Sequence, residues 1–326
     1  MKKDLFRTIA LTLAFVAASP ALAQTDWPQP GHTIRIIVPW PPGAANDALG
    51  RLVAQRLQSK LGATAIVENR TGAAGLIGTQ AVISAAPDGY TLLASAFNTA
   101  VMPMVLKSAN FDPEVDLEVV ARTAVAPLVL VMTTQRPQKT LSDVISAAKA
   151  SPRDWLFAVS ANGSAGHLAT IAFIKRTGIP LDIVPYRGTA PALTDVMGGT
   201  VQLLMDTSFA LLPPAKDGVH VRALAIATRE RSRLAPDVPT FAEAGLPGFE
   251  FNSWYGVWAP KGTPRAIQEK INTLVQEMMR DPEVTAKLRA GWLEPVAESI
   301  DDSKRFISSE IVRAHELLQS AGFKPE

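Results

Sequence analysis

The stretch "TIRIIVPWPPGAANDALGRLVAQRL", residues 33–57, joins an extended apolar run to a helical pattern through a turn of small residues. Branched apolar side chains dominate the first run, which favours a buried strand. After the turn, Leu49, Leu52 and Leu57 follow helical spacing, and Gly62 supplies a stop signal. This order of strand, turn and helix is typical of an α/β fold.

The second half of the chain repeats the same arrangement. "WLFAVS", residues 155–160, precedes a small-residue turn and a helical pattern that ends at Gly178. Further apolar runs, "PLVLVM", "PLDIVPY", "VQLLMD" and "VRALAIAT", predict more strands, in mostly parallel sheets. Two similar units predict two lobes. Residues 229–251, rich in proline and glycine, predict a long surface excursion, and the two helical patterns after it are expected to pack on the first lobe.

The composition excludes several classes of protein. Residues 1–23 have a charged start, an apolar stretch and small residues near Ala23, and we expect a secretory signal peptide cleaved after Ala23. Without this segment the chain has 29 basic and 29 acidic side chains, and no basic stretch indicates nucleic-acid binding. The absence of cysteine excludes disulfides and thiol chemistry. No later segment is long enough for a membrane helix.

The turn after the first strand is the first candidate site. Pro42, Gly43, Ala44 and Ala45 lie where a strand meets a helix, so their backbone N–H groups and the helix N-terminus favour a bound anion. Asp47 in the first helical turn has two open interpretations, a helix cap or a direct ligand contact.

A second small-residue turn, "ENRTGAAGLIGTQ", contains Ala73 as a further candidate contact. It lacks the spacing of a dinucleotide fingerprint and the Lys-Ser or Lys-Thr pair of a phosphate loop. We therefore expect no cofactor.

The third turn, "ANGSAGH", offers Asn162 and Ser164, with His167 three residues further on. A Ser164/His167 nucleophile and base would make an exported serine hydrolase, but the stretch matches no nucleophile elbow and supplies no third group. A capping serine with a packed or ligand-facing histidine fits the pattern better. The four histidines show no metal-ligand spacing, so no metal is expected.

Strand ends in the second half supply the remaining candidates. Tyr186 and Arg187 follow "PLDIVP", where ligands of α/β proteins usually bind, and Arg187 could pair with a carboxylate or with an internal acid. Asp206 could receive a ligand amine or hydroxyl, or cap the next helix. Phe97, with Trp40 and Phe209, is a candidate wall of the cleft or part of the core.

These stretches together resemble the extracytoplasmic solute receptors of the tripartite tricarboxylate transporter system, the Bug receptors. The segments that resemble the family are "IRIIVPWPPGAANDALGRLVA", "ENRTGAAGLIGTQAV", "APDGYTLL", "NGSAGHLA", "VPYRGTAPALTDVMGG" and "WYGVWAPKGTP". The resemblance implies a two-lobed α/β periplasmic binding protein of the type II, Venus-flytrap class, with a hinge and a central ligand cleft. Residues 24–126 and 250–326 would form lobe 1, and residues 127–249 lobe 2.

The resemblance also implies a function and a site. The protein would be a monomeric periplasmic receptor that binds a small carboxylate and delivers it to membrane transporter subunits of the tripartite tricarboxylate type, without catalysis. A sensory role for the same ligand stays open. The ligand contacts that the resemblance implies are Pro42, Gly43, Ala44, Ala45 and Asp47 on one side of the cleft, and Asn162, Ser164 and His167 on the other.

Two departures from the family pattern concern the ligand. Family turns commonly read P-G-G-A-T-D, where this chain has Ala44 in place of the second glycine. Family turns also read P-G-A-G-G-N, where Leu76 replaces the last residue. Both changes make the turns less polar, and they predict that the ligand is a less polar acid than the usual ligands of the family.

Overall fold

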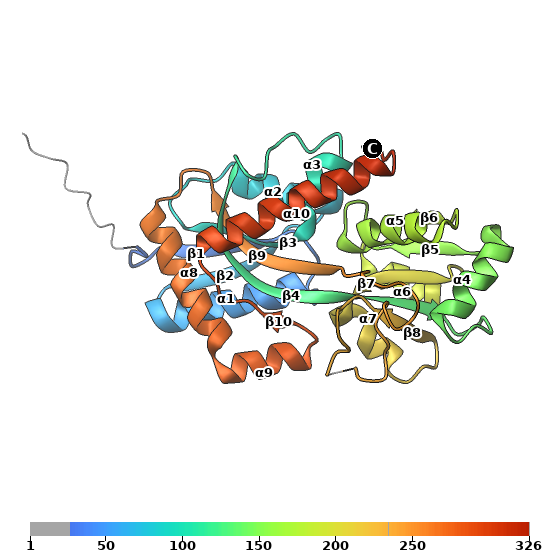
Figure 1. Ribbon diagram of the computed structural model, residues 1–326. Helices are drawn as coiled ribbons and strands as arrows, with labels where there is room; N and C mark the ends of the chain where they lie inside the picture. Colours follow the sequence, from blue (N-terminus) through green and yellow to red (C-terminus); the bar gives the residue numbers. More distant parts are fainter. Residues whose placement is uncertain (1–26, 234, 326) are drawn as a thin grey trace, which may run out of the picture.

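The computed structural model describes residues 27–233 and 235–325, which form two lobes joined by long strands (Figure 1). The strands are β1 (Thr33–Val38), β2 (Thr64–Asn69), β3 (Thr91–Ala96), β4 (Leu117–Thr133), β5 (Leu156–Val159), β6 (Asp182–Pro185), β7 (Leu203–Thr207), β8 (Val221–Ile226), β9 (Asn252–Pro260) and β10 (Glu294–Pro295). The helices are α1 (Ala45–Leu61), α2 (Leu76–Ile83), α3 (Phe97–Val105), α4 (Leu141–Ala150), α5 (Ala165–Thr177), α6 (Thr189–Met197), α7 (Ser208–Ala215), α8 (Arg265–Arg280), α9 (Pro282–Ala290) and α10 (Ile300–Ser320). Two short 3-10 helices span Ala73–Gly75 and Pro152–Asp154.

The strands follow the order β2-β1-β3-β9-β4-β7-β5-β6, and β8 and β10 also pair with β4. In the first lobe β1 lies parallel to β2 and β3, whereas β9 runs antiparallel to β3. In the second lobe β5 lies parallel to β6 and β7. Each lobe therefore contains a set of parallel strands, and the antiparallel strand β4 connects the two sets.

Strand β4 is the element that links the lobes. Its residues 117–127 pair with β9, and from Leu128 onward it pairs with β7 and β8 instead. The partner changes between Pro127, opposite Asn252, and Leu128, opposite Thr207. One strand thus belongs to both sheets.

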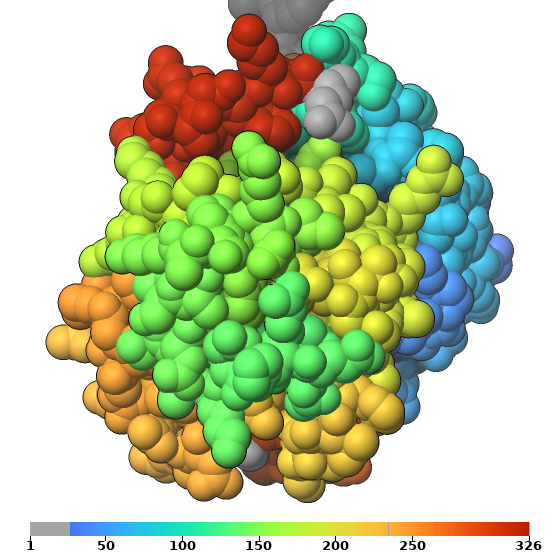
Figure 2. Space-filling model, turned by 90° about the vertical axis from the view of Figure 1, so that its right-hand side faces the viewer, coloured from blue at the N-terminus to red at the C-terminus, as the bar shows by residue number. Residues whose placement is uncertain are grey.

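The C-terminal helix α10 lies across both lobes. It packs on β4 and α3 and also on α5, which belongs to the second lobe. In Figure 2, which looks onto the second lobe, the red C-terminal segment lies directly against the yellow-green surface of α5. Of the two helical patterns expected to pack on the first lobe, α8 packs on α1 and β4, whereas α10 extends beyond that lobe.

The α/β architecture predicted from the sequence is confirmed, with two differences. The sheet is mixed, because β4 and β9 run antiparallel to their neighbours, and β4 continues from the first lobe into the second. Residues 229–251 are only partly a surface excursion, because Phe241 and Phe249 insert into the core. In the part of the chain that the structure describes, no helix is long and apolar enough to cross a membrane. The predicted signal peptide lies outside the described residues.

Candidate functional site

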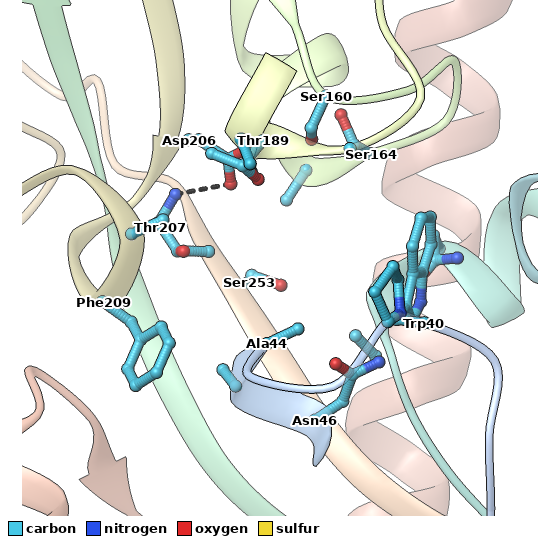
Figure 3. A pocket seen from close by; sticks show the side chains of 18 of the residues that line it. Trp40, Ala44, Asn46, Ser160, Ser164, Thr189, Asp206, Thr207, Phe209 and Ser253 are labelled. Carbon is cyan, nitrogen blue, oxygen red and sulfur yellow. Dashed lines mark hydrogen bonds between the residues drawn. The ribbon is translucent and has the colours of Figure 1, made fainter. Parts of the chain in front are cut away.

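A cavity of about 480 Å³ lies between the two lobes (Figure 3). The first lobe contributes the turn before α1 and the start of α3, and the second contributes the ends of β5 and β7 and the starts of α5, α6 and α7. Strand β9 supplies Ser253 and Tyr255. The lining residues are Trp40, Pro41, Pro42, Gly43, Ala44, Ala45, Asn46, Ala96, Phe97, Asn98, Ser160, Ser164, Ala165, Arg187, Gly188, Thr189, Ala190, Pro191, Leu193, Asp206, Thr207, Phe209, Ala210, Ser253 and Tyr255.

Helix α1 begins at the cavity without a side-chain cap. Its N-cap is Ala44, and the preceding Gly43 has φ +90°, a conformation that glycine adopts without strain. The first N–H groups of a helix have no partner within the helix and carry a partial positive charge. Ala44 offers them no side-chain oxygen, so this end of the cavity is suited to an anion.

Asp47 stabilises this turn through hydrogen bonds to neighbouring residues. Its Oδ2 accepts a hydrogen bond from the Gly43 N–H at 3.0 Å, and it is also bonded to Arg51 and Asn69. Burial alone would raise the pKa of Asp47, but the hydrogen bonds from Arg51, Gly43 and Asn69 lower it overall. Asp47 is therefore an ionised group with internal partners, and it is not among the lining residues.

Helix α5 begins across the cavity, and unlike α1 it has a side-chain cap. Ser164 is its N-cap, and its Oγ accepts a hydrogen bond from the His167 N–H at 3.1 Å. The Nδ1 of His167 accepts a hydrogen bond from the Gly163 N–H at 3.0 Å. Burial lowers the pKa of His167 to about 4, so its ring is neutral at pH 7. The ring also packs against Phe323 in a T-shaped arrangement, and His167 does not line the cavity.

This geometry differs from that of a nucleophile and its base. A general base must take the hydroxyl proton through a ring nitrogen. Here the hydrogen bond between the two residues is donated by the main-chain N–H of His167 to Ser164 Oγ. The Nδ1 atom of the His167 ring accepts a hydrogen bond from the Gly163 N–H instead. Ser164 and His167 are thus arranged as a helix cap and its supporting residue.

The wall from the second lobe is polar and is centred on Asp206 (Figure 3). Asp206 Oδ2 accepts a hydrogen bond from Thr189 Oγ1, and Oδ1 accepts one from the Thr207 N–H, both at 2.7 Å. Burial raises the pKa of Asp206, and hydrogen bonds from Thr189, Thr207 and Ser160 act in the opposite direction. No group of three His, Asp or Glu side chains that could hold a metal occurs among the described residues.

Comparison with known proteins identifies the family. Residues 49–323 match the model of the tripartite tricarboxylate transporter family receptor. The chain belongs to this family. Protein BugT of Bordetella pertussis is 36% identical over 98% of this chain and 99% of its own length. R. palustris Rpa4515, solved with adipate, is 36% identical with a TM-score of 0.86, covering 91% of this chain and 99% of its own. MatC from Rhodopseudomonas palustris, solved with bound malate, is 30% identical with a TM-score of 0.80, covering 89% and 100%.

Family members are periplasmic binding proteins, and this receptor has their two-lobed fold. The structure brings many of the predicted site residues of this family member to one cavity: Pro42, Gly43, Ala44, Ala45, Phe97, Ser164, Arg187 and Asp206. It does not bring Asp47, Ala73, Asn162, His167 or Tyr186 to the cavity lining.

The predicted residues outside the lining of this receptor occupy other places. Asp47 and His167 accept hydrogen bonds from the N–H groups of Gly43 and Gly163. Ala73 is exposed in a turn with φ +46°. The Tyr186 hydroxyl donates to Asp195 Oδ2 at 2.7 Å, and burial followed by this contact raises the pKa of Tyr186 to about 12.

Sequence reasoning missed several polar lining residues of the receptor. Ser160 and Thr189 follow the ends of β5 and β6, so their positions at strand ends were a usable signal. Ser253 and Tyr255 gave no such signal, because they lie within the apolar strand β9. They reach the cavity because β9 begins opposite Pro127, where β4 passes from one lobe to the other.

Proposed function

We propose that this protein is a periplasmic receptor that binds a small organic carboxylate and delivers it to a membrane transporter of the tripartite tricarboxylate type. The ligand carboxylate lies between the turn at residues 42–46 and the turn at residues 160–165. Rpa4515 with adipate and MatC with malate support an organic acid as the ligand. The protein acts by binding and release, as receptors of its family do.

One observation carries the proposal: the N-termini of α1 and α5 border the same cavity. Two helix ends, whose first N–H groups have no partner within their own helix backbone, concentrate partial positive charge on one small volume. A ligand that touches both lobes stabilises the arrangement in which they are close, because only differential contact shifts such an equilibrium. The division into residues 24–126 with 250–326 and residues 127–249 is part of this proposal, with the hinge at Pro127 and Leu128 of β4.

Ala44 permits a test that separates binding from stability. Aspartate and asparagine are both good N-cap residues, so Ala44→Asp and Ala44→Asn should each keep or improve the stability of α1. Only Ala44→Asp adds a negative charge beside the proposed carboxylate site. We expect calorimetric affinity for the acid found by a thermal-shift screen to fall at least tenfold further in Ala44→Asp than in Ala44→Asn.

The screen should include dicarboxylates, amino acids, hydroxy acids and aromatic acids, together with chromogenic esters. Ligand-induced thermal stabilisation without ester turnover is the expected result. Equal affinities of the Ala44→Asp and Ala44→Asn variants would contradict the carboxylate site, and turnover that depends on Ser164 would favour a hydrolase.

Delivery to a transporter is tested in cells. Deletion of the gene should abolish uptake of the radiolabelled acid, and complementation with the wild-type gene should restore it. A deletion that changes transcription in response to the acid but leaves uptake intact would instead indicate a sensory receptor.

A further inference from the structure

The cavity that we assign to an organic acid ligand also contains a buried acidic side chain, Asp206. It is the second-last residue of β7, is 6% exposed, and lies on the wall formed by the second lobe together with Ser160, Thr189 and Thr207 (Figure 3). The other charged lining residue, Arg187, is exposed. The ionisable group that lies deepest in this cavity is therefore an acid. Burial raises its pKa, and hydrogen bonds from Thr189, Thr207 and Ser160 oppose that rise.

Two hydroxyl groups beside Asp206, those of Thr189 and Ser160, have their protons directed toward it. Thr189 Oγ1 donates to Oδ2 at 2.7 Å, and the Ser160 side chain also forms a hydrogen bond with the carboxylate. A hydroxyl has one proton and two lone pairs. Once that proton is donated to Asp206, the oxygen can only accept further hydrogen bonds. This wall thus presents acceptors to a ligand.

The surroundings of Asp206 also disfavour a second negative charge. Hydrogen bonds and burial act on Asp206, and no Lys, Arg or His among the described residues pairs with it. When Asp206 is ionised, a ligand carboxylate at this wall meets a carboxylate and two hydroxyl oxygens that have already donated their protons. A ligand hydroxyl or ammonium would find several acceptors.

The rest of the cavity is largely apolar. Trp40, Pro42 and Phe97 line it on the first lobe, and Leu193 and Phe209 line it on the second. Such surfaces favour a ligand with an apolar middle, since burying that part of the ligand removes apolar area from water.

We propose that the ligand is a monocarboxylate with an apolar body and a remote hydrogen-bond donor, a hydroxyl or an amino group, which is received by Asp206, Ser160 and Thr189. This inference rests on the proposed function, because it takes the carboxylate to lie at the helix N-termini. It differs in ligand class from the two dicarboxylates, adipate and malate, found with the relatives.

Two matched series test the inference by calorimetry at pH 7.5. The first series is hexanoate, 6-hydroxyhexanoate, 6-aminohexanoate and adipate, and the second is benzoate, 4-hydroxybenzoate and terephthalate. Within at least one series, a donor-bearing acid should bind at least tenfold more tightly than the matched dicarboxylate. In Asp206→Asn, whose amide adds a donor and removes the charge, this preference should shrink at least tenfold.

If Asp206→Asn does not fold, Thr189→Val removes one hydroxyl acceptor and should lower affinity for the donor-bearing acid by about threefold or more, with little effect on the unsubstituted acid. A preference of less than tenfold for the donor-bearing acids over the matched dicarboxylate in both series overturns the inference and leaves the carboxylate receptor standing. The same holds if neither series binds but malate does. Failure of every carboxylate to bind would overturn the proposed function as well.

Discussion

Asp47 and His167 occupy the same position in the first turns of α1 and α5, and each accepts a 3.0 Å hydrogen bond from the N–H of a glycine four residues earlier. Gly43 and Gly163 both have positive φ, at +90° and +74°. The two lobes therefore fix their cavity-facing turns in the same way, one with an ionised carboxylate and the other with a neutral imidazole. This parallel leads to the first two predictions.

Asp47→Ala should loosen the turn at residues 42–46. The substitution removes the acceptor for Gly43 and the partner of Arg51 and Asn69, and the loss of such charged hydrogen bonds costs about 2 kcal/mol of unfolding free energy. Asp47→Asn keeps an oxygen for Gly43 and should recover part of the loss. Urea unfolding and calorimetric affinity measure both effects; an Asp47→Ala variant as stable as Asp47→Asn would refute the role of the Gly43 contact.

His167 should make the protein less stable in acid. Its pKa is lowered from 6.5 to about 4 by burial, so between these values the unfolded chain binds a proton that the folded chain does not. Stability then falls as pH falls through this window, by about 3 kcal/mol in total. His167→Asn places an oxygen near Nδ1 without titrating, so its stability should depend less on pH. Parallel stability curves for the two proteins, measured by urea unfolding from pH 7 to pH 4, would contradict the prediction.

Phe323 should set the pH at which His167 titrates. The Phe323 ring packs on the imidazole with centroids 5.2 Å apart, and it comes from the segment after α10. Phe323→Ala admits water to the ring, so the pKa of His167 should rise toward 6.5, because burial is what lowers it. NMR titration of the His167 ring protons measures this shift. Phe323→Leu retains apolar cover and should leave the pKa near its wild-type value.

Gly166→Ala should separate α5 from β7. A Cβ at this position would lie 2.1 Å from the Met205 carbonyl oxygen, so the backbone must move, and we expect a loss of about 3 kcal/mol. Gly198→Ala is the matched control, since its Cβ would have no neighbour closer than 3.4 Å and its φ is negative. That variant should be as stable as wild type or more so by about 0.5 kcal/mol. Equal urea midpoints for the two variants would show that the contact is not tight.

The local elements of the fold were predictable from the sequence. The helix that begins after "PPGA" ends where expected, because Gly62 adopts the left-handed conformation that stops α1, and Gly178 does the same for α5. The serine in "NGSAGH" was predictable as a helix cap, since its spacing to the next N–H groups is fixed within a single turn.

The long strand β4 was only partly predictable. The sequence indicated a strand at residues 127–132, whereas the structure extends it back to Leu117 because β9 pairs with that part. Strand pairing between residues more than a hundred positions apart produces no local sequence pattern from which the strand could be predicted.

The sequence alone determined the α/β alternation, the two helix N-termini and the identity of the small residues at each turn, because these depend on backbone propensities within a few residues. Only the tertiary structure decided which side chains face the cavity. Asp47 and His167 turned toward backbone donors, and Asp206 came to lie beside Ser160 and Thr189. The direction of a polar side chain is set by the hydrogen-bond partners that distant strands bring to it, since a buried polar group left without a partner is costly.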